Sequence, residues 1–331
     1  GGWPRRCLSS GAWAAWITQA SGGLMLLFIL KRVARGLLTI LLVVAFAFIA
    51  LRVSSDPAVV ALGPDAPPEA IVAFRKAWGL DQPIWLQFFY YLGGLARGEF
   101  GRSLLSGAEV LPLVASRILV TLKIMAPALL IGIAVGVSAG AYAALRHQTK
   151  TDRTVMIFAV AGFTIPNFVL GLVLVLVFAV YLRWLPSGGN DSWNSAILPI
   201  VTLATSWAAI LARFTRSSMV EVLGQPYIRT ASAKGLRWRD VVRRHALPNA
   251  SIPIVTTIGF MVGGLLAGAV VTESVFSWPG IGQLIVTSVA ARDVAVVQCV
   301  LLLVATTMVI SNMTVDILYG VLDPRIKTGG H

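Results

Sequence analysis

The sequence predicts an all-α polytopic membrane protein with six transmembrane helices. The mean hydropathy is +0.81, and only 12% of the residues are charged, whereas soluble domains are about a quarter charged. The chain also contains six apolar segments that reach the roughly 20 residues needed to cross a bilayer. We expect the spans near residues 33–51, 118–144, 154–182, 195–215, 252–272 and 294–320.

The distribution of charge predicts the orientation of these spans. The termini and even-numbered loops hold 18 Lys or Arg against five Asp or Glu, whereas the opposite side holds nine of each sign. Short cytoplasmic loops are enriched in Lys and Arg, so both termini are expected to be cytoplasmic. The net charge of +13 therefore follows from topology in a lipid bilayer, and we expect no nucleic-acid partner.

The composition changes along the chain and indicates its organisation. Residues 53–117 are rich in proline and carry both charge signs, which predicts an extracytoplasmic subdomain. Within it, Ile71, Phe74 and Trp78 fall at helical spacing and predict a short amphipathic helix over 68–79. The expected parts are an extension of unknown role (1–23), a first transmembrane helix (24–52), this subdomain, a transmembrane core (118–320) and a cytoplasmic tail (321–331).

Two spans contain glycines four residues apart, a spacing that permits close contact between helices. Gly132, Gly136 and Gly140 lie in the second span, and Gly259, Gly263, Gly264 and Gly268 lie in the fifth. The stretch 136–140 also matches the G-x-S-x-G motif of a nucleophile elbow. That motif needs a strand-to-helix turn, so a position inside a membrane helix favours packing over catalysis. Prolines within spans, such as Pro166, predict kinks.

Several chemical functions lack their residues in this sequence. There is no G-x-x-x-x-G-K-[ST] phosphate loop, and the three histidines have no metal-ligand spacing. Cys7 and Cys299 fall in a tail and a span, so a disulfide is not expected. We therefore expect neither an enzyme nor a cofactor or metal site in this chain.

The basic loop at 225–250 is the most informative stretch. Pro226 suits the first turn of a short helix over 226–234, and Gly235 suits the left-handed residue that ends it. A second basic helix is expected at 237–245, closed by Pro248. One face of the first helix carries, at i, i+3, i+4 and i+7, the residues Tyr227, Thr230, Ala231 and Lys234. The loop either receives a soluble partner or is a solvated loop that only orients the protein.

Four polar residues within spans are candidates for a translocation path. They are Thr164, Asn167, Asn312 and Asp316. The alternative interpretations are structural: Asp316 pairs with Arg325, and Asn167 satisfies the carbonyl group freed at Pro166.

The basic loop, YIRTASAKGLRWRDVVRRHALPNA at 227–250, resembles the cytoplasmic loop of permease subunits in binding-protein-dependent ABC importers. The resemblance is closest to the first permease of dipeptide and oligopeptide systems and runs collinearly from about residue 25 to 327. Two departures are SSDPA at 54–58, where the family more often has a glycine before Asp-Pro, and residues 1–23, which have no counterpart. Other matching stretches are FILKRVARGLL (28–38), GLDQPIWLQFFYYLGGLARGEFGRSL (79–104), FTIPNFVLGLVLVLVF (163–178), ARFTRSSMVEVL (212–223), TESVFSWPGIGQL (272–284) and VDILYGVLDPRI (315–326).

The resemblance implies the type I ABC importer transmembrane fold in a bacterial inner membrane. It implies a second homologous permease subunit, cytoplasmic ABC ATPase subunits that bind ATP and Mg, and an extracytoplasmic substrate-binding protein. The loop 216–250 would couple the permease to the ATPase, with Tyr227, Ala231, Lys234 and Gly235 on the matching helix and turn.

Other functions remain open from the sequence. A permease for nickel or another small solute has the same architecture. An ion-coupled secondary transporter would normally carry inverted repeats and a midplane ion site, neither of which is evident in this sequence. An intramembrane enzyme lacks a catalytic set, and a passive scaffold would be distinguished by its behaviour on purification.

Overall fold

The computed structural model describes residues 30–322, apart from 51, 53–56, 64, 78, 267 and 268. The extension 1–23, most of the tail 321–331, Trp78, Gly268 and most of the 54–58 stretch lie outside the described residues, as does the side chain of Asp316. The described part is helical and contains no strand beyond one isolated bridge between Arg102 and Glu109.

Five helices are long and apolar enough to cross a membrane, and a bent pair raises the number to six if it counts as one span. The predicted six spans agree with this arrangement. The five are the first helix (Leu30–Ala50), α5 (Val110–Leu145), α8 (Asn194–Leu223), a continuous rod over Trp238–Gly263, and α14 (Val294–Leu322). Shorter helices are α2 (Pro57–Leu62), α3 (Pro68–Ala77), α4 (Ile84–Ala96), α12 (Val270–Val275) and α13 (Ile281–Ala290).

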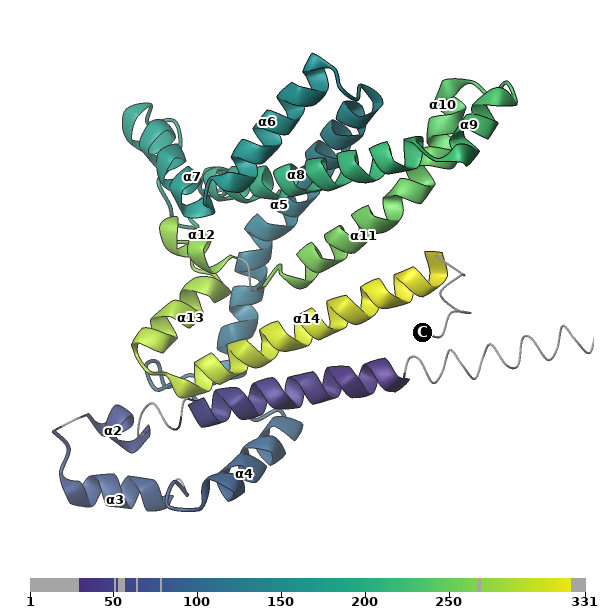
Figure 1. The fold of residues 1–331 in the computed structure, drawn as a ribbon. Helices are drawn as coiled ribbons and strands as arrows, with labels where there is room; N and C mark the ends of the chain where they lie inside the picture. Colours follow the sequence, from purple (N-terminus) through teal and green to yellow (C-terminus); the bar gives the residue numbers. More distant parts are fainter. Residues whose placement is uncertain are drawn as a thin grey trace, which may run out of the picture.

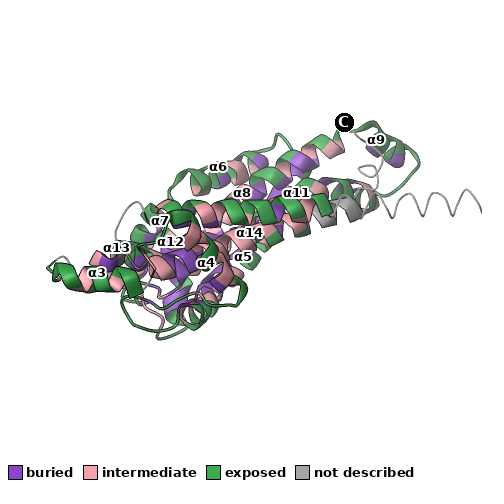
Figure 2. Cartoon of the chain, turned by 90° about the horizontal axis from the view of Figure 1, so that it is seen from below, coloured by how far each residue is buried: buried purple, intermediate pink, exposed green. Residues whose placement is uncertain are grey.

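The elements form an elongated bundle with two distinct ends (Figure 1). The helices α2, α3 and α13 lie at one end, and α9 (Pro226–Ala233) and α10 (Trp238–Val241) lie at the other. Many buried residues gather around α5, α12 and α14, whereas α3 is largely exposed (Figure 2). By the charge bias, the end with α9 is expected to be the cytoplasmic one.

The third span is broken at Pro166, where the sequence predicted only a kink. α6 (Lys150–Thr164) is followed by α7 (Asn167–Leu174) and a π-helix, η1 (Val175–Tyr181), and the two parts of the span differ in direction by 97°. A proline disfavours the helical conformation at the residue before it, and Ile165 is indeed extended with φ −71° and ψ 119°. The predicted span 154–182 is thus two helices.

The fifth span also differs from its prediction of 252–272. The rod begins at Trp238, well before the expected start, and it ends at Gly263, with Gly264 as the capping residue. Two adjacent glycines are poor helix formers, so the chain turns there and α12 begins separately at Val270.

Close contact between α5 and α8 forms the centre of the bundle. The predicted glycine face is confirmed, because a Cβ atom on Gly136 would lie 2.6 Å from the carbonyl oxygen of Ala208 and 2.8 Å from Cβ of Leu211. Gly140 lies equally close to the backbone of Ala212. The absence of side chains at these glycines lets the two backbones approach.

Smaller contacts fix the outer helices. A Cβ atom on Gly36 would lie 2.7 Å from Cγ1 of Val309, so the first helix packs against α14. The ring of Phe48 lies 5.4 Å from that of Phe88 in α4, between ring centroids. On the fifth span, the hydroxyl of Ser311 in α14 donates to the carbonyl of Gly259 at 2.8 Å.

A buried carboxylate holds the turn between α12 and α13 against α5. Glu273 is fully buried; it accepts hydrogen bonds from the hydroxyl of Thr121 at 2.6 Å and from the backbone N–H of Gln283 at 3.0 Å. The indole N–H of Trp278 donates to the carbonyl of Val120 at 2.8 Å. Burial raises the pKa of the Glu273 carboxyl, and the hydrogen bond from Thr121 acts in the opposite direction. The turn between α12 and α13 is therefore held in place against α5.

The close contact between α5 and α8 predicts that one added methyl group lowers the stability of the protein at Gly136 but not at Gly93. Gly136→Ala should lower the melting temperature of the purified protein, because the new methyl group meets α8 and overpacking costs about 1–3 kcal/mol. Gly93→Ala in α4 is the matched control: its Cβ would meet nothing within 4 Å, and alanine favours a helix over glycine. Equal melting temperatures for Gly136→Ala and Gly93→Ala would contradict the contact.

Candidate functional site

The short helix α9 forms as the sequence predicted, one residue shorter than expected. Pro226 occupies the first turn, where its missing N–H is not needed. The hydroxyl of Thr230 donates to the carbonyl of Pro226 at 3.1 Å, and the N–H of Lys234 donates to the carbonyl of Thr230 at 3.0 Å. These bonds link residues four apart at the start and at the end of α9, so the helix is about two turns long.

Gly235 ends α9 in the left-handed conformation. Its φ is +81°, and the N–H of Gly235 donates to the carbonyl of Ser232 at 3.0 Å. A Cβ atom placed on Gly235 would meet nothing within 4 Å. The backbone conformation is therefore the sole local demand for glycine at this position.

One face of α9 is buried against the ends of the long helices. Ile228 is 2% exposed and Ala231 is 7% exposed. Both belong to one hydrophobic cluster, called here the cytoplasmic cluster, that draws residues from α5, α8, α10 and the rod. Its buried members are Ala144, Met219, Ile228, Ala231, Val241, Val242, Ala246 and Ala250.

The opposite face of α9 is open. Tyr227, Thr230 and Lys234 are exposed, as the face assignment predicted. The assignment was wrong for Ala231, because that side chain points into the cytoplasmic cluster rather than outward. Ile228 was not among the predicted site residues, although Ile228 and Ala231 stand three residues apart, a spacing that places two residues on one face.

The second basic helix does not end at Pro248. α10 passes into a π-helix, η2 (Val242–Ala246), and then into α11 (Leu247–Gly263) without interruption. The N–H of Leu247 donates to the carbonyl of Val242 in the wider π turn, and the side-chain amide of Asn249 donates to the carbonyl of His245 at 2.7 Å. The wider π turn directly precedes Pro248, and the helix continues through it, so the loop and the fifth span form one rod.

Basic side chains surround α9. Arg229, Lys234, Arg237, Arg239, Arg243 and Arg244 are all exposed. Within the part of the chain that the structure describes, none of these six forms an ion pair with an acidic residue. The surface around α9 therefore offers free positive charge and the polar groups of Tyr227 and Thr230.

An ion pair ties the neighbouring loop to α8. Asp152 is buried at the start of α6, and Arg216 of α8 donates to both its oxygens, from Nε at 3.0 Å and from Nη2 at 2.8 Å. The N–H of Gln148 donates to the same carboxylate at 3.0 Å. On the other side of α8, the hydroxyl of Ser218 donates to the carbonyl of Ala250 at 3.1 Å. The cytoplasmic ends of α5, α6, α8 and α11 are thus joined.

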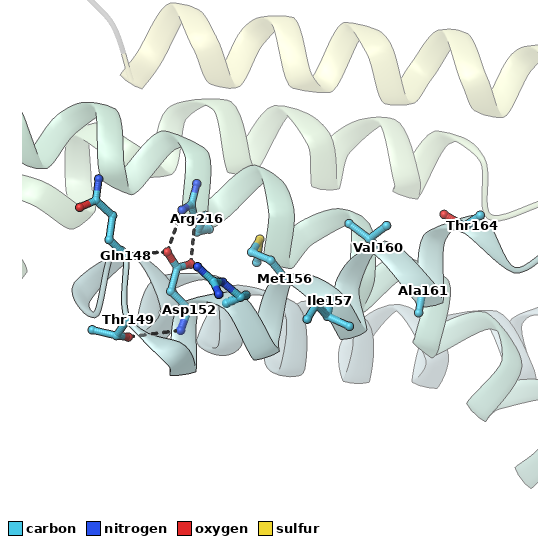
Figure 3. A pocket seen from close by; sticks show the side chains of 10 residues that line it. Gln148, Thr149, Asp152, Met156, Ile157, Val160, Ala161, Thr164 and Arg216 are labelled. Carbon is cyan, nitrogen blue, oxygen red and sulfur yellow. Dashed lines mark hydrogen bonds and ion pairs between the residues drawn. The ribbon is translucent and has the colours of Figure 1, made fainter.

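A groove of about 890 Å³ runs along α6 from this ion pair to the break in the span. Figure 3 shows Met156, Val160 and Thr164 following one another along the helix, with Arg216 reaching Asp152 at the other end. Thr164, one of the four residues predicted for the translocation path, lines the groove where the span is broken.

Of the other path candidates, Asn167 and Asn312 do not line this groove. Asn167 accepts a short hydrogen bond from the hydroxyl of Ser206, which joins α7 to α8. Asn312 is half-buried in α14, and the side chain of Asp316 lies outside the described residues. Arg325, the partner predicted for Asp316, also lies outside the described residues.

Comparison with known proteins gives one consistent result. The family described as binding-protein-dependent transport system inner membrane component matches residues 136–328, and the N-terminal family of the same systems matches residues 25–125. The glutathione transport system permease protein GsiC of Escherichia coli K12 is 41% identical over 304 residues, which cover 92% of this chain and 99% of that protein. GsiC of Salmonella typhi is 42% identical over 306 residues, with the same coverage.

The fold matches a solved transporter as well. The methionine ABC transporter MetNI, in an inward-facing conformation, aligns with a TM-score of 0.53 and 19% identity over 64% of this chain and 97% of that one. The chain therefore belongs to the inner membrane components of binding-protein-dependent transport systems, and it is a permease subunit of an ABC importer with the type I fold in the bacterial inner membrane.

Proposed function

We propose that this permease forms half of the translocation path for dipeptides or oligopeptides and that α9 couples this path to a separate ATPase. The observation that carries the proposal is the division of α9 into a face buried among the long helices and a face open to a partner. The peptide assignment is supported by the name of the GsiC relatives, because glutathione is itself a peptide.

The contacts of α9 define how force would pass into the membrane. Ile228 and Ala231 pack with Met219 of α8 and with Val241 and Val242 at the start of the rod. A partner that displaces α9 therefore displaces the ends of two membrane-crossing helices together. Both helices continue toward the other end of the bundle, so a shift at the cytoplasmic end tilts them and opens or closes the path.

The remaining components belong to other chains. The ATPase subunits supply ATP and Mg, a second homologous permease supplies the other half of the path, and an extracytoplasmic substrate-binding protein delivers the solute. On α9, Tyr227, Thr230 and Lys234 contact the ATPase. Ala231 anchors the helix, and Gly235 sets the angle of the rod that follows.

The path itself is proposed to run beside the break in the third span. Thr164 lines the groove at that break, and Asn167 lies three residues further on. Asn312 and Asp316 contribute from α14, four residues apart.

The proposed function is tested by reconstituting the chain with its partner subunits and measuring ATP-driven uptake of labelled dipeptides and of glutathione. Absence of uptake for every peptide would overturn the peptide assignment.

Substitution at Gly235 should separate ATP hydrolysis from transport. Gly235→Leu forces a branched side chain into a left-handed conformation, at a cost of about 1–2 kcal/mol, and the turn relaxes by moving the rod relative to α9. We expect uptake by the assembled complex to fall while ATP hydrolysis continues. Gly235→Asn is the matched control, since asparagine tolerates this conformation. Uptake by Gly235→Leu equal to that of Gly235→Asn would refute the role of the turn.

Truncation of the buried side chain of Ile228 should also weaken the coupling between ATP hydrolysis and uptake. Ile228→Ala leaves a cavity in the cytoplasmic cluster and costs about 2–4 kcal/mol of packing, so α9 no longer moves as one body with α8. We expect weaker uptake for each ATP hydrolysed. Leu247→Ala removes a comparable side chain from an exposed position on α11 and should leave this ratio unchanged. The measurement is the ratio of the two rates in proteoliposomes.

A further inference from the structure

We propose that a small cavity at the outer end of α5 binds one end of a zwitterionic solute, with Lys123 taking a carboxylate and Asp191 taking an ammonium group. This inference rests on the proposed function and deepens it, because it names the chemistry recognised at the outer mouth of the path. The cavity has a volume of about 260 Å³ and is lined by Lys123, by residues 190–193 and by Ala196 and Trp278.

The position of Lys123 along α5 places it at the outer membrane boundary. α5 ends at Leu145 on the cytoplasmic side, and 22 residues of α helix span about 33 Å. The hydrocarbon core of a bilayer is about 30 Å thick. Lys123 therefore lies where the apolar layer ends, at a depth that an arriving solute would reach before it enters the membrane.

The cavity beside Lys123 is bounded by α8 and by the turn between α12 and α13. Ala196 of α8 and Trp278 of the α12–α13 turn line the same cavity, and each is only 1% exposed. A lysine that served only to anchor the helix would extend to lipid headgroups. Lys123 lines this cavity, and its exposed side chain presents the ammonium group to whatever occupies the cavity.

The two opposite charges in the cavity do not neutralise each other. Over the described part of the chain, neither Lys123 nor Asp191 forms an ion pair or a side-chain hydrogen bond with another residue. Both are exposed. A cavity with one free cation and one free anion complements a ligand that carries one of each.

The walls of the cavity are fixed. The indole N–H of Trp278 is committed to the carbonyl of Val120 at 2.8 Å, so Trp278 offers only its ring to the cavity. The hydroxyls of Ser192 and Ser195 lie 3.3 Å apart at the start of α8. Because both ends of the wall are held by hydrogen bonds, the charged side chains are presented on a rigid frame.

Size and composition restrict the ligand further. Pockets that enclose a whole small molecule measure roughly 300–1,000 Å³, so a cavity of about 260 Å³ takes one end of a peptide-like solute. Trp193 lines the cavity and is 72% exposed. Its ring is free to cover the ammonium group of the ligand through a cation–π contact.

The test follows ligand occupancy by thiol labelling in the assembled complex. Asn190→Cys places a reporter among the lining residues without removing either charge or the contact between Ser192 and Ser195; Cys7 is replaced by serine, and Cys299 is buried. Alanyl-alanine should slow modification of the reporter by a charged maleimide. N-acetyl-alanyl-alanine amide, which lacks both charges, should not slow it.

Substitutions then assign the charges. Lys123→Gln should raise the dipeptide concentration that halves the labelling rate by about tenfold or more, the loss expected for a hydrogen bond between charged groups. Lys123→Arg should retain protection. The matched control is Lys76→Gln, on an exposed lysine of α3 outside the cavity. If the Lys123→Gln complex does not assemble, Asp191→Asn supplies an independent test, with the same loss expected.

The outcomes separate this inference from the function on which it rests. Equal protection by the blocked and free dipeptides would overturn the site, as would the absence of protection in a wild-type-like complex that still imports peptide. A change in labelling with Lys123→Gln that does not depend on solute would identify a structural ion pair and also overturn the site. Absence of ATP-driven uptake in the wild-type complex would instead remove the proposed function.

Discussion

The packing of Ile228 and Ala231 into the cytoplasmic cluster is the contact on which the rest of the account depends. α9 has only eight residues, and isolated helices of that length are not stable in water. It exists because its buried face is held by α5, α8 and the start of the rod. The same contact that stabilises α9 makes it part of the membrane helices, so stability of the site and transmission of force have one physical origin.

The stiffness of the neighbouring elements extends this contact. Glycines on α5 bring its backbone against α8, and the bidentate pair between Arg216 and Asp152 joins the start of α6 to α8. The broken third span, by contrast, interrupts regular backbone hydrogen bonding beside a groove. Irregular backbone at membrane depth occurs where protein or a water-filled cavity satisfies it. The molecule thus combines a rigid frame with one irregular span at the place where a path is proposed.

Local patterns predicted most of the fold and part of the site. Hydropathy located the spans, and Pro226 with Gly235 bounded α9, because these features act within a few residues. The extent of the fifth span was mispredicted since proline normally ends a helix, whereas here a π turn directly precedes Pro248 and the helix continues through it. The pairing of Asp152 with Arg216 joins positions 64 residues apart, and no local pattern indicates it. Ala231 was placed on the wrong face because the position of the cluster depends on three other helices.

The most direct test is whether α9 moves as one body with α8 during transport. Spin labels on Ser232→Cys in α9 and Ser217→Cys in α8, both exposed positions, report the distance between the two helices in the assembled complex. If α9 and α8 move together, this distance stays the same when ATP binds, while the distance from Ser232→Cys to a label on the second permease changes. A change between the two labels within this chain, with α8 remaining in place, would contradict it.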